Sequence, residues 1–79
     1  MKKLYSIGET SKITGVSVQT LRNYSNGELL RPAYVNPENG YRYFTFEQFH
    51  RIDRIKYLRS LGVSLSEIKK IYSVDTVED

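Results

Sequence analysis

Polar side chains that can recognise a partner lie together on one side of a predicted helix from Val18 to Ser25. They donate or accept hydrogen bonds, and they are Gln19, Thr20, Arg22 and Asn23. Val18 and Leu21 fall on the other side at the spacing of an apolar helix face. A helix of this width can enter the major groove of DNA. Hydrogen bonding to nucleic acid is therefore the first chemistry that the sequence indicates.

A preceding helix would hold this one in place. Ser6 and Glu9 have the spacing of a capping box, in which each side chain binds a free backbone N–H at the helix start. Ile7 and Ile13 supply the apolar positions for about two helical turns. Gly15 then ends the helix, because glycine tolerates the positive φ that helix ends require.

The turn between these two helices is short. Ser17 is a ready N-cap for the second helix, and Gly27 ends it. Residues 6–26 therefore predict a helix-turn-helix. A small α-helical domain without a DNA partner is the alternative, because paired amphipathic helices around a glycine are common; the downstream residues favour DNA.

A β-hairpin is predicted next. Leu29 and Leu30 are expected to fill the core behind the second helix. Residues 34–35 and 41–43 are prone to form strands, and Asn39-Gly40 between them is a strong hairpin signal because both residues accept positive φ. A hairpin directly after a helix-turn-helix predicts a mainly α-helical fold, the winged helix-turn-helix with a two-stranded wing.

A second helix pair follows the hairpin. Thr45 and Gln48 form another capping box, and Leu61-Gly62 ends that helix. Its apolar stripe recurs every third residue at Phe46, Phe49, Ile52, Ile55 and Leu58. Ser64 and Glu67 cap the last helix of the pair. Its inward positions are expected to be Leu65, Ile68 and Ile71, and its outward ones Lys69 and Lys70.

The sequence is expected to divide after residue 74. Asp75 and Glu78 repeat the capping spacing, with Val77 between them. This predicts one domain over residues 1–74, followed in residues 75–79 by the start of a linker or dimerisation helix that is cut off. A charged tail is the alternative.

Composition excludes several classes of protein. The chain has 79 residues, no cysteine and one histidine, so one domain is expected, with no disulfide framework, no metal site and no cofactor. No membrane span or signal peptide is found, and a cytoplasmic protein is expected. Residues 1–74 hold all 12 Lys and Arg but only six of the nine acids, which favours a polyanionic partner.

His50 and Asp53 are the nearest approach to a catalytic pair. Three residues apart on a helix, they are usually a surface pair, and neither a nucleophile nor a second carboxylate completes a site. The chain is expected not to be an enzyme.

Three stretches together resemble the N-terminal DNA-binding domain of the MerR family of bacterial transcription regulators, especially the branch that answers multiple drugs or other organic effectors. The stretches read YSIGETSKITGVSVQTLRNYSNGELLRP, NGYRYFT and IKYLRSLGVSLSEIKKIY. The resemblance covers residues 4–72. It implies a winged helix followed by a helix pair that acts as another wing.

The resemblance also implies a mechanism and partners. Family members bind a pseudo-palindromic promoter operator in double-stranded DNA as homodimers, joined by a coiled-coil helix C-terminal to this domain. They activate transcription by distorting an overlong spacer, so that RNA polymerase meets both promoter hexamers on one face. Any effector would be bound by that C-terminal part. This fragment is expected to be a monomer or a weak dimer.

The recognition helix is implied to contact DNA through Ser17, Val18, Gln19, Thr20, Arg22, Asn23 and Tyr24. Gln19 can pair with adenine, and Val18 or the methyl group of Thr20 can meet a thymine methyl. Arg22 is expected on guanine or phosphate, and a salt bridge to an acid such as Glu9 is the alternative.

The wing and the third helix are implied to add contacts. Arg42 matches the family's wing arginine, on phosphate or in the minor groove. Tyr41 and Tyr43 alternate with it, so that one face packs and the other meets DNA. Lys56 and Arg59 match basic phosphate contacts, and a merely solvated helix face is the alternative.

The sequence departs from the family pattern beside Tyr24. Tyr24 itself matches a tyrosine that touches the DNA backbone, with core packing as the alternative. The family commonly reads Arg-Tyr-Tyr and then an acid, whereas Asn23 and Ser25 stand here. Asn23 lacks the aromatic ring that would brace the backbone, although it can bind phosphate or adenine. The departure bears on the operator sequence and not on DNA binding itself.

Two other functions stay open from the sequence. One is an architectural or excisionase-like winged-helix protein, which binds DNA without an effector or a promoter spacer. The other is a protein-interaction domain that uses Tyr41 and Tyr43 as anchors. The salt dependence of binding distinguishes a protein-interaction domain from a DNA-binding one, because contacts to phosphate weaken steeply as the salt concentration rises.

Overall fold

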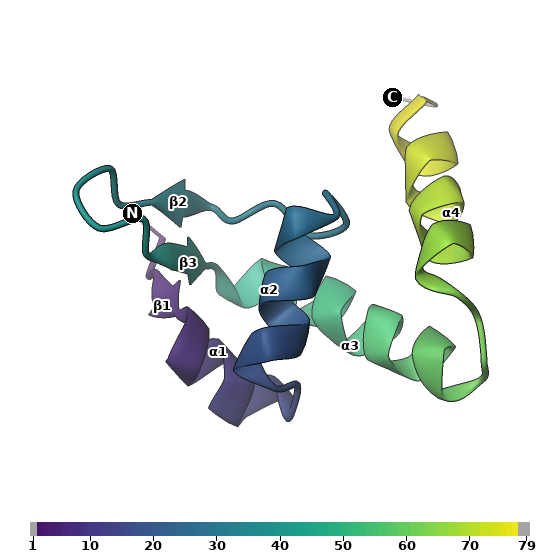
Figure 1. Cartoon of the computed structure of the whole chain (residues 1–79), viewed down its shortest axis with the longest axis horizontal. Coiled ribbons are helices and arrows are strands. Elements are labelled where there is room, and N and C mark those ends of the chain that lie inside the picture. Colours follow the sequence, from purple (N-terminus) through teal and green to yellow (C-terminus); the bar gives the residue numbers. More distant parts are fainter. Residues whose placement is uncertain (1, 78–79) are drawn as a thin grey trace.

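The computed structural model describes the backbone of residues 2–77 and the side chains of residues 2–72. In this part of the chain, four helices pack with a small three-stranded sheet, which lies on one side of the molecule while the last helix lies on the other (Figure 1). The elements in chain order are β1 (Tyr5–Ser6), α1 (Ile7–Thr14), α2 (Val18–Asn26), β2 (Tyr34–Val35), β3 (Arg42–Phe44), α3 (Phe46–Ser60) and α4 (Leu65–Val77). This order is that of the predicted winged helix-turn-helix.

The helix-turn-helix has the caps that the sequence predicts. Ser6 N donates to Glu9 Oε1 at 2.9 Å, and Glu9 N donates to Ser6 Oγ at 3.1 Å. The bond from the Ser6 backbone favours the ionised carboxylate and holds the pKa of Glu9 below its ordinary value. The cap therefore stabilises the folded chain at neutral pH and loses this effect as the pH falls through that lowered pKa. Ser17 Oγ caps α2 by accepting from Thr20 N.

α1 buries a different face from the predicted one. Ile13 is 56% exposed, whereas Thr10 and Thr14 are buried. Ile13 follows Ile7 by six residues, a rotation of about 240° at about 100° per residue, so the two side chains leave the helix on different sides. Thr10 and Thr14 lie close to one and two turns beyond Ile7 and face the core instead. Thr14 Oγ1 donates to Thr10 O at 2.8 Å, which satisfies this buried hydroxyl.

Gly15 ends α1 in the left-handed region, at φ 76°, and alanine should be unfavourable there. An added Cβ would also approach Lys56 Nζ to 3.1 Å. We expect Gly15→Ala to lower the free energy of unfolding by about 1 kcal/mol, measured by urea denaturation. Gly8→Ala is the matched control, because Gly8 lies within α1 and a Cβ there would meet only Ser6 Oγ, at 3.9 Å. The free energy of unfolding of Gly8→Ala should rise by about 0.5 kcal/mol. A fall in both variants would contradict the assignment of a left-handed conformation to Gly15 and not to Gly8.

The sheet has one strand more than predicted. β3 lies between β1 and β2 and is antiparallel to both, with Tyr5 opposite Phe44 and Tyr34 opposite Tyr43. β3 begins one residue later than predicted, because Tyr41 closes the hairpin turn by accepting a hydrogen bond from Asn36 N at 2.9 Å. The additional strand fixes the hairpin to the start of α1.

The hairpin turn differs from the prediction at Asn39. Gly40 has a φ of 75°, but Glu28 is the one non-glycine residue with positive φ in the described chain. Gly40 N donates to Asn36 O at 2.7 Å, so a single left-handed residue closes this four-residue loop. Asn39 Oδ1 instead accepts from Tyr41 N at 2.9 Å, a local bond typical of asparagine in turns.

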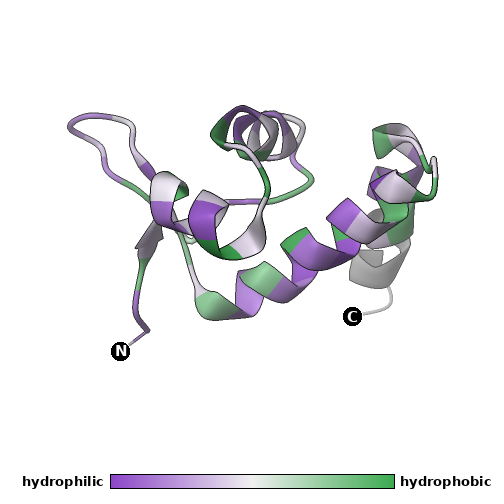
Figure 2. Ribbon diagram, turned by 90° about the horizontal axis from the view of Figure 1, so that it is seen from below, coloured by the Kyte–Doolittle hydropathy of each residue, from purple (hydrophilic) through white to green (hydrophobic). Residues whose placement is uncertain are grey.

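The core lies between the helix-turn-helix, β3 and α3. Leu29 and Leu30 are buried in it as predicted. Hydrophobic and hydrophilic residues alternate along α3, which is the pattern of a helix with one buried side (Figure 2). The buried apolar side chains are Val16, Leu21, Tyr24, Leu29, Leu30, Phe44, Phe49, Ile52, Ile55 and Ile68.

The second helix pair buries less than predicted. Phe46 stands at the first turn of α3 and is 59% exposed, and its ring makes edge-to-face contacts with Phe49 and His50 of the same helix. On α4, Ile68 is fully buried, whereas Leu65 and Ile71 are 37% and 38% exposed. α4 packs chiefly against α3, and among its residues 65–72 Ile68 alone is buried.

α4 runs without a break from Leu65 to Val77. The helix start predicted at Asp75 therefore falls inside α4 and begins no new element. Glu78, the other residue of that predicted cap, lies outside the described residues. Within residues 2–77, the helices are too short or too polar to cross a membrane.

Candidate nucleic-acid interface

α2 turns its predicted polar side chains outward. Ser17, Gln19, Arg22 and Asn23 are exposed, and Val18 and Thr20 are half-buried. Leu21 and Tyr24 are buried on the opposite side. The helix therefore separates a core side from an outer side, as the sequence predicts.

Two hydrogen bonds order the outer side of α2 before any partner arrives. Gln19 Nε2 donates to Asn23 Oδ1 at 3.1 Å, and Ser17 Oγ donates to Thr20 Oγ1 at 2.9 Å. Gln19 keeps its Oε1 and one N–H, and Asn23 keeps both of its N–H donors. An acceptor beside a donor is the pair of groups that the major-groove edge of adenine requires.

Arg22 has no anionic partner within the described residues. Between residues 2 and 72, the one salt bridge joins Lys2 to Glu47 at 3.6 Å. Glu9, the acid named as an alternative partner, binds Ser6 instead. The guanidinium group of Arg22 is therefore available to an anion from outside, which favours the DNA interpretation over the salt bridge.

A groove of about 480 Å³ lies along the wing, which we define as residues 34–44, and is bordered by Ser6 and Ile7 and by Arg22 of α2. Arg22 borders it from α2 and Arg42 from β3, so positive charge stands on both sides. Tyr41 at its edge is 64% exposed, whereas Tyr43 is half-buried and packs against Tyr34, with ring centroids 5.9 Å apart. The wing residues named from the sequence thus border one concave surface.

Arg42 is also bound inside the protein. Its Nη2 donates to Asn26 Oδ1 at 2.8 Å, and its Nη1 donates to Arg22 O at 3.5 Å. Arg22 is the middle residue of α2 and Asn26 the last, so the guanidinium joins the wing to that helix. The role of Asn26 was not predicted from the sequence. One signal was present: α2 has no basic residue in its last turn, where a cation is favoured, so a cation from another element could be expected there.

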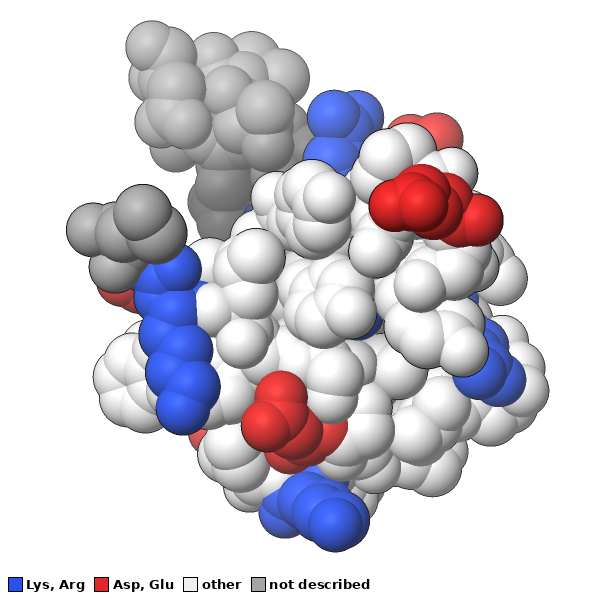
Figure 3. Space-filling view, turned by 90° about the vertical axis from the view of Figure 1, so that its left-hand side faces the viewer, with Lys and Arg blue, Asp and Glu red and all other residues white. Residues whose placement is uncertain are grey.

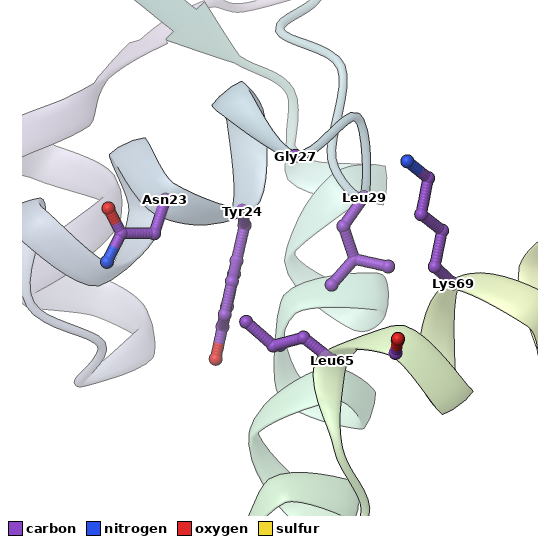
Figure 4. Close-up of a pocket in the computed structure, with 7 residues that line it drawn as sticks. Asn23, Tyr24, Gly27, Leu29, Leu65 and Lys69 are labelled. Atoms are coloured by element: carbon purple, nitrogen blue, oxygen red, sulfur yellow. The ribbon is translucent and has the colours of Figure 1, made fainter.

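Tyr24 packs in the core. It is 5% exposed, and burial raises the pKa of its hydroxyl against the opposing charge of Arg59. Its ring borders a cleft of about 230 Å³ between α2 and α4. Figure 4 shows Tyr24 and Leu65 side by side at this cleft, with Lys69 on the far side. Core packing is thus what the structure shows for the ring, and a DNA contact of its hydroxyl stays a prediction.

Lys56 and Arg59 each bind a carbonyl group of the protein. Lys56 Nζ donates to Thr14 O at 3.2 Å, at the end of α1, and Arg59 Nη1 donates to Val63 O at 3.0 Å. Both residues are exposed overall, and an ammonium group has three donors and a guanidinium group five. N–H groups therefore remain for a phosphate, and this contact stays a prediction.

Charge is spread thinly over the wing side of the molecule. Figure 3 shows Lys and Arg singly around this face, with Asp and Glu among them and uncharged surface over most of it. On this face, a polyanion would therefore meet separate charged side chains and not one dense basic patch. The described side chains of residues 2–72 also include no group of three or more His, Cys, Asp or Glu that could hold a metal ion.

Comparison with known sequences decides the family. Residues 5–74 match the family described as "MerR HTH family regulatory protein". The chain belongs to the MerR family. The resemblance seen in three stretches of the sequence is thereby confirmed. The prediction that the chain is not an enzyme is confirmed too, because this is a family of regulators.

Two regulators from Bacillus subtilis (strain 168) illustrate the relationship. The chain is 45% identical over 74 residues to the "Multidrug-efflux transporter 1 regulator", covering 94% of the chain and 27% of that protein. It is 34% identical over 67 residues to the "HTH-type transcriptional activator mta", covering 85% of the chain and 26% of that protein. The MerR-family chain thus spans about a quarter of the length of these relatives.

Solved structures confirm the winged helix-turn-helix of the MerR family. One is the crystal structure of HiNmlR, described as a MerR family regulator lacking the sensor domain, bound to promoter DNA. It superposes on this chain with a TM-score of 0.85 at 26% identity, and the match covers 98% of this chain and 58% of that one. Another is the cryo-EM structure described as the EcmrR-DNA complex in EcmrR-RPo; its TM-score is 0.83 at 41% identity, covering 89% and 26%.

Proposed function

We propose that the chain is the sequence-specific DNA-binding domain of a bacterial MerR-type transcription regulator. In this proposal it binds a pseudo-palindromic promoter operator and distorts the spacer to control transcription. The observation that carries the proposal is the exposed side of α2, where Arg22 has no anionic partner among the described residues and borders the groove beside the wing. The relatives described as DNA complexes support it, because they share this fold.

We assign roles within this interface by the groups that stay free. Gln19 reads a base edge, with Val18 and Thr20 beside it at the start of α2. Arg22 and Asn23, further along, bind a base or a phosphate. The remaining contacts are assigned to the DNA backbone, namely Ser17, Tyr24, Tyr41, Arg42, Tyr43, Lys56 and Arg59.

Partners beyond the domain belong to the same proposal. Because the chain spans about a quarter of the length of its relatives, we propose that in the whole protein a dimerisation helix comes after α4 and that any effector binds beyond it. The dimer would meet RNA polymerase at the promoter, in the cytoplasm where bacterial DNA lies. The 79-residue chain by itself should then bind one half-site, as a monomer or a weak dimer.

Selection from randomised DNA duplexes tests the proposal, with the chain fused to a generic dimerising coiled coil. We expect an enriched inverted repeat with a fixed separation of its half-sites. Enrichment of single half-sites, or of AT-rich DNA without dyad symmetry, would favour the architectural alternative. Absence of any salt-sensitive binding would contradict both DNA-binding functions.

Gln19→Ala should change which sequence is preferred, because it removes a donor and an acceptor that read a base edge. We expect about a ten-fold loss on the selected site and little loss on a site changed at the base that Gln19 reads. Arg42→Ala provides the contrast, since loss of a backbone contact should weaken all sequences about equally. Competition binding with the two duplexes measures both variants. Equal losses on both duplexes for Gln19→Ala would exclude base reading by this residue.

A further inference from the structure

The wing has few attachments to the rest of the domain. β2 and β3 are two and three residues long, and Tyr34, Val35 and Tyr41 are largely exposed. Phe44 anchors the inner end of the wing in the core. A hairpin this short is not stable alone. β1 pairs with β3 at Tyr43 and Phe44 only, so the part of the wing beyond Tyr43 is joined to the helices by the bonds of Arg42 to α2.

Arg42 makes all the hydrogen bonds that join the wing to α2 within the described part of the chain, through Asn26 Oδ1 at 2.8 Å and Arg22 O at 3.5 Å. The last carbonyl groups of a helix lack intrahelical partners and carry partial negative charge. α2 has no basic residue in its own last turn. Arg42 places a cation beside the side chain of Asn26, the last residue of this helix, while N–H groups of residues 27–30 bind the last carbonyl groups themselves.

We propose that Asn26 and Arg42 form a clasp that fixes the wing against the recognition helix, and that Asn26 is a positioning residue for DNA binding. The inference rests on the proposed function. Two donors of the guanidinium group serve the clasp, and others remain for a phosphate. A phosphate on Arg42 is then held at a set place relative to α2. DNA that contacts both the wing and α2 must adapt to the fixed distance between them. The clasp therefore helps to set how far the DNA is distorted.

Loss of the clasp lets the wing take several positions in the free protein. DNA must then order the wing as it binds, and that ordering weakens the affinity. We expect Asn26→Ala to weaken binding about five-fold, the effect of one hydrogen bond. Alanine favours a helix more than asparagine does, so α2 itself should remain folded.

Hydrogen exchange tests the clasp without DNA. The Asn36 amide donates to Tyr41 O at 2.9 Å within the wing, and it should exchange faster in Asn26→Ala. The amide of the fully buried Ile52 should keep its rate. Asn26→Asp retains an acceptor oxygen for the guanidinium and should restore protection of the wing. Unchanged exchange of the Asn36 amide in Asn26→Ala would overturn the proposal.

A double-mutant cycle tests the consequence for DNA. The 79-residue chain is titrated into a fluorescent duplex that carries one selected half-site, and anisotropy gives the affinity. Asn26→Ala should cost about five-fold in the original chain and almost nothing in Arg42→Gln, because the clasp is already open there. Losses that multiply would mean that Asn26 acts on DNA by itself and would overturn the clasp. If the original chain bound no duplex, the proposed function would fail, while hydrogen exchange would still decide the clasp.

Discussion

Phe44→Ala is expected to leave the domain marginally stable or unfolded at room temperature. Phe44 is fully buried, and it ends β3 opposite Tyr5 of β1. Truncation of a buried phenylalanine costs about 3–5 kcal/mol. A domain of this length has only about 4–12 kcal/mol of stability in total. Because β3 contacts both β1 and α1, the loss falls where the wing joins the helix-turn-helix.

Phe46→Ala is the matched control for that substitution. Phe46 lies two residues further on and is 59% exposed. Its substitution removes the same ring, but it should lower the free energy of unfolding by only about 1 kcal/mol or less. Circular dichroism during urea denaturation measures both variants. Similar losses in the two variants would contradict the burial of Phe44 and the exposure of Phe46.

DNA affinity is expected to fall roughly a hundred-fold between about 50 mM and 200 mM salt. Each phosphate contact contributes about 0.9 to the slope of log affinity against log salt. Four basic side chains are assigned to DNA, namely Arg22, Arg42, Lys56 and Arg59, and they would give a slope near four. The thin spread of charge over the wing side favours such separate contacts (Figure 3).

Single substitutions refine this salt prediction. Arg42→Ala should lower the slope by about one. Lys2→Ala should leave it unchanged, because the ammonium group of Lys2 is already paired with Glu47. Affinity that does not depend on salt would exclude phosphate contacts and favour the protein-interaction alternative, with Tyr41 and Tyr43 as anchors.

Local features of this fold could be predicted because their causes lie within a few residues. The capping box of Ser6 and Glu9 and the left-handed Gly15 are of this kind. Burial depends instead on which other element covers a side chain. The burial of Ile13 and Phe46 was therefore predicted wrongly. Their spacing indicates an apolar side of a helix, but it does not show how far another element covers that side. β1 was missed because two residues are too few to show a strand pattern.

The candidate site likewise has features that could be predicted from local sequence and features that could not. The outer side of α2 follows from helical periodicity, and Gln19, Arg22 and Asn23 lie on it as predicted. The internal bonds of Arg42 and Lys56 could not be predicted, because their partners are far away in the sequence and are set by packing. The family resemblance supplied the positions of both side chains but not these bonds.

The pairing of β1 with β3 has a consequence for the order of folding. Tyr5 lies opposite Phe44, so this part of the sheet closes a loop that contains the whole helix-turn-helix. Contacts so distant in sequence form late, whereas the contacts of adjacent helices form early. Synthesis from the N-terminus strengthens this order, because α1 and α2 emerge before β3 exists. We expect the slowest kinetic phase of folding to be the one that seats the wing and completes the DNA-binding surface.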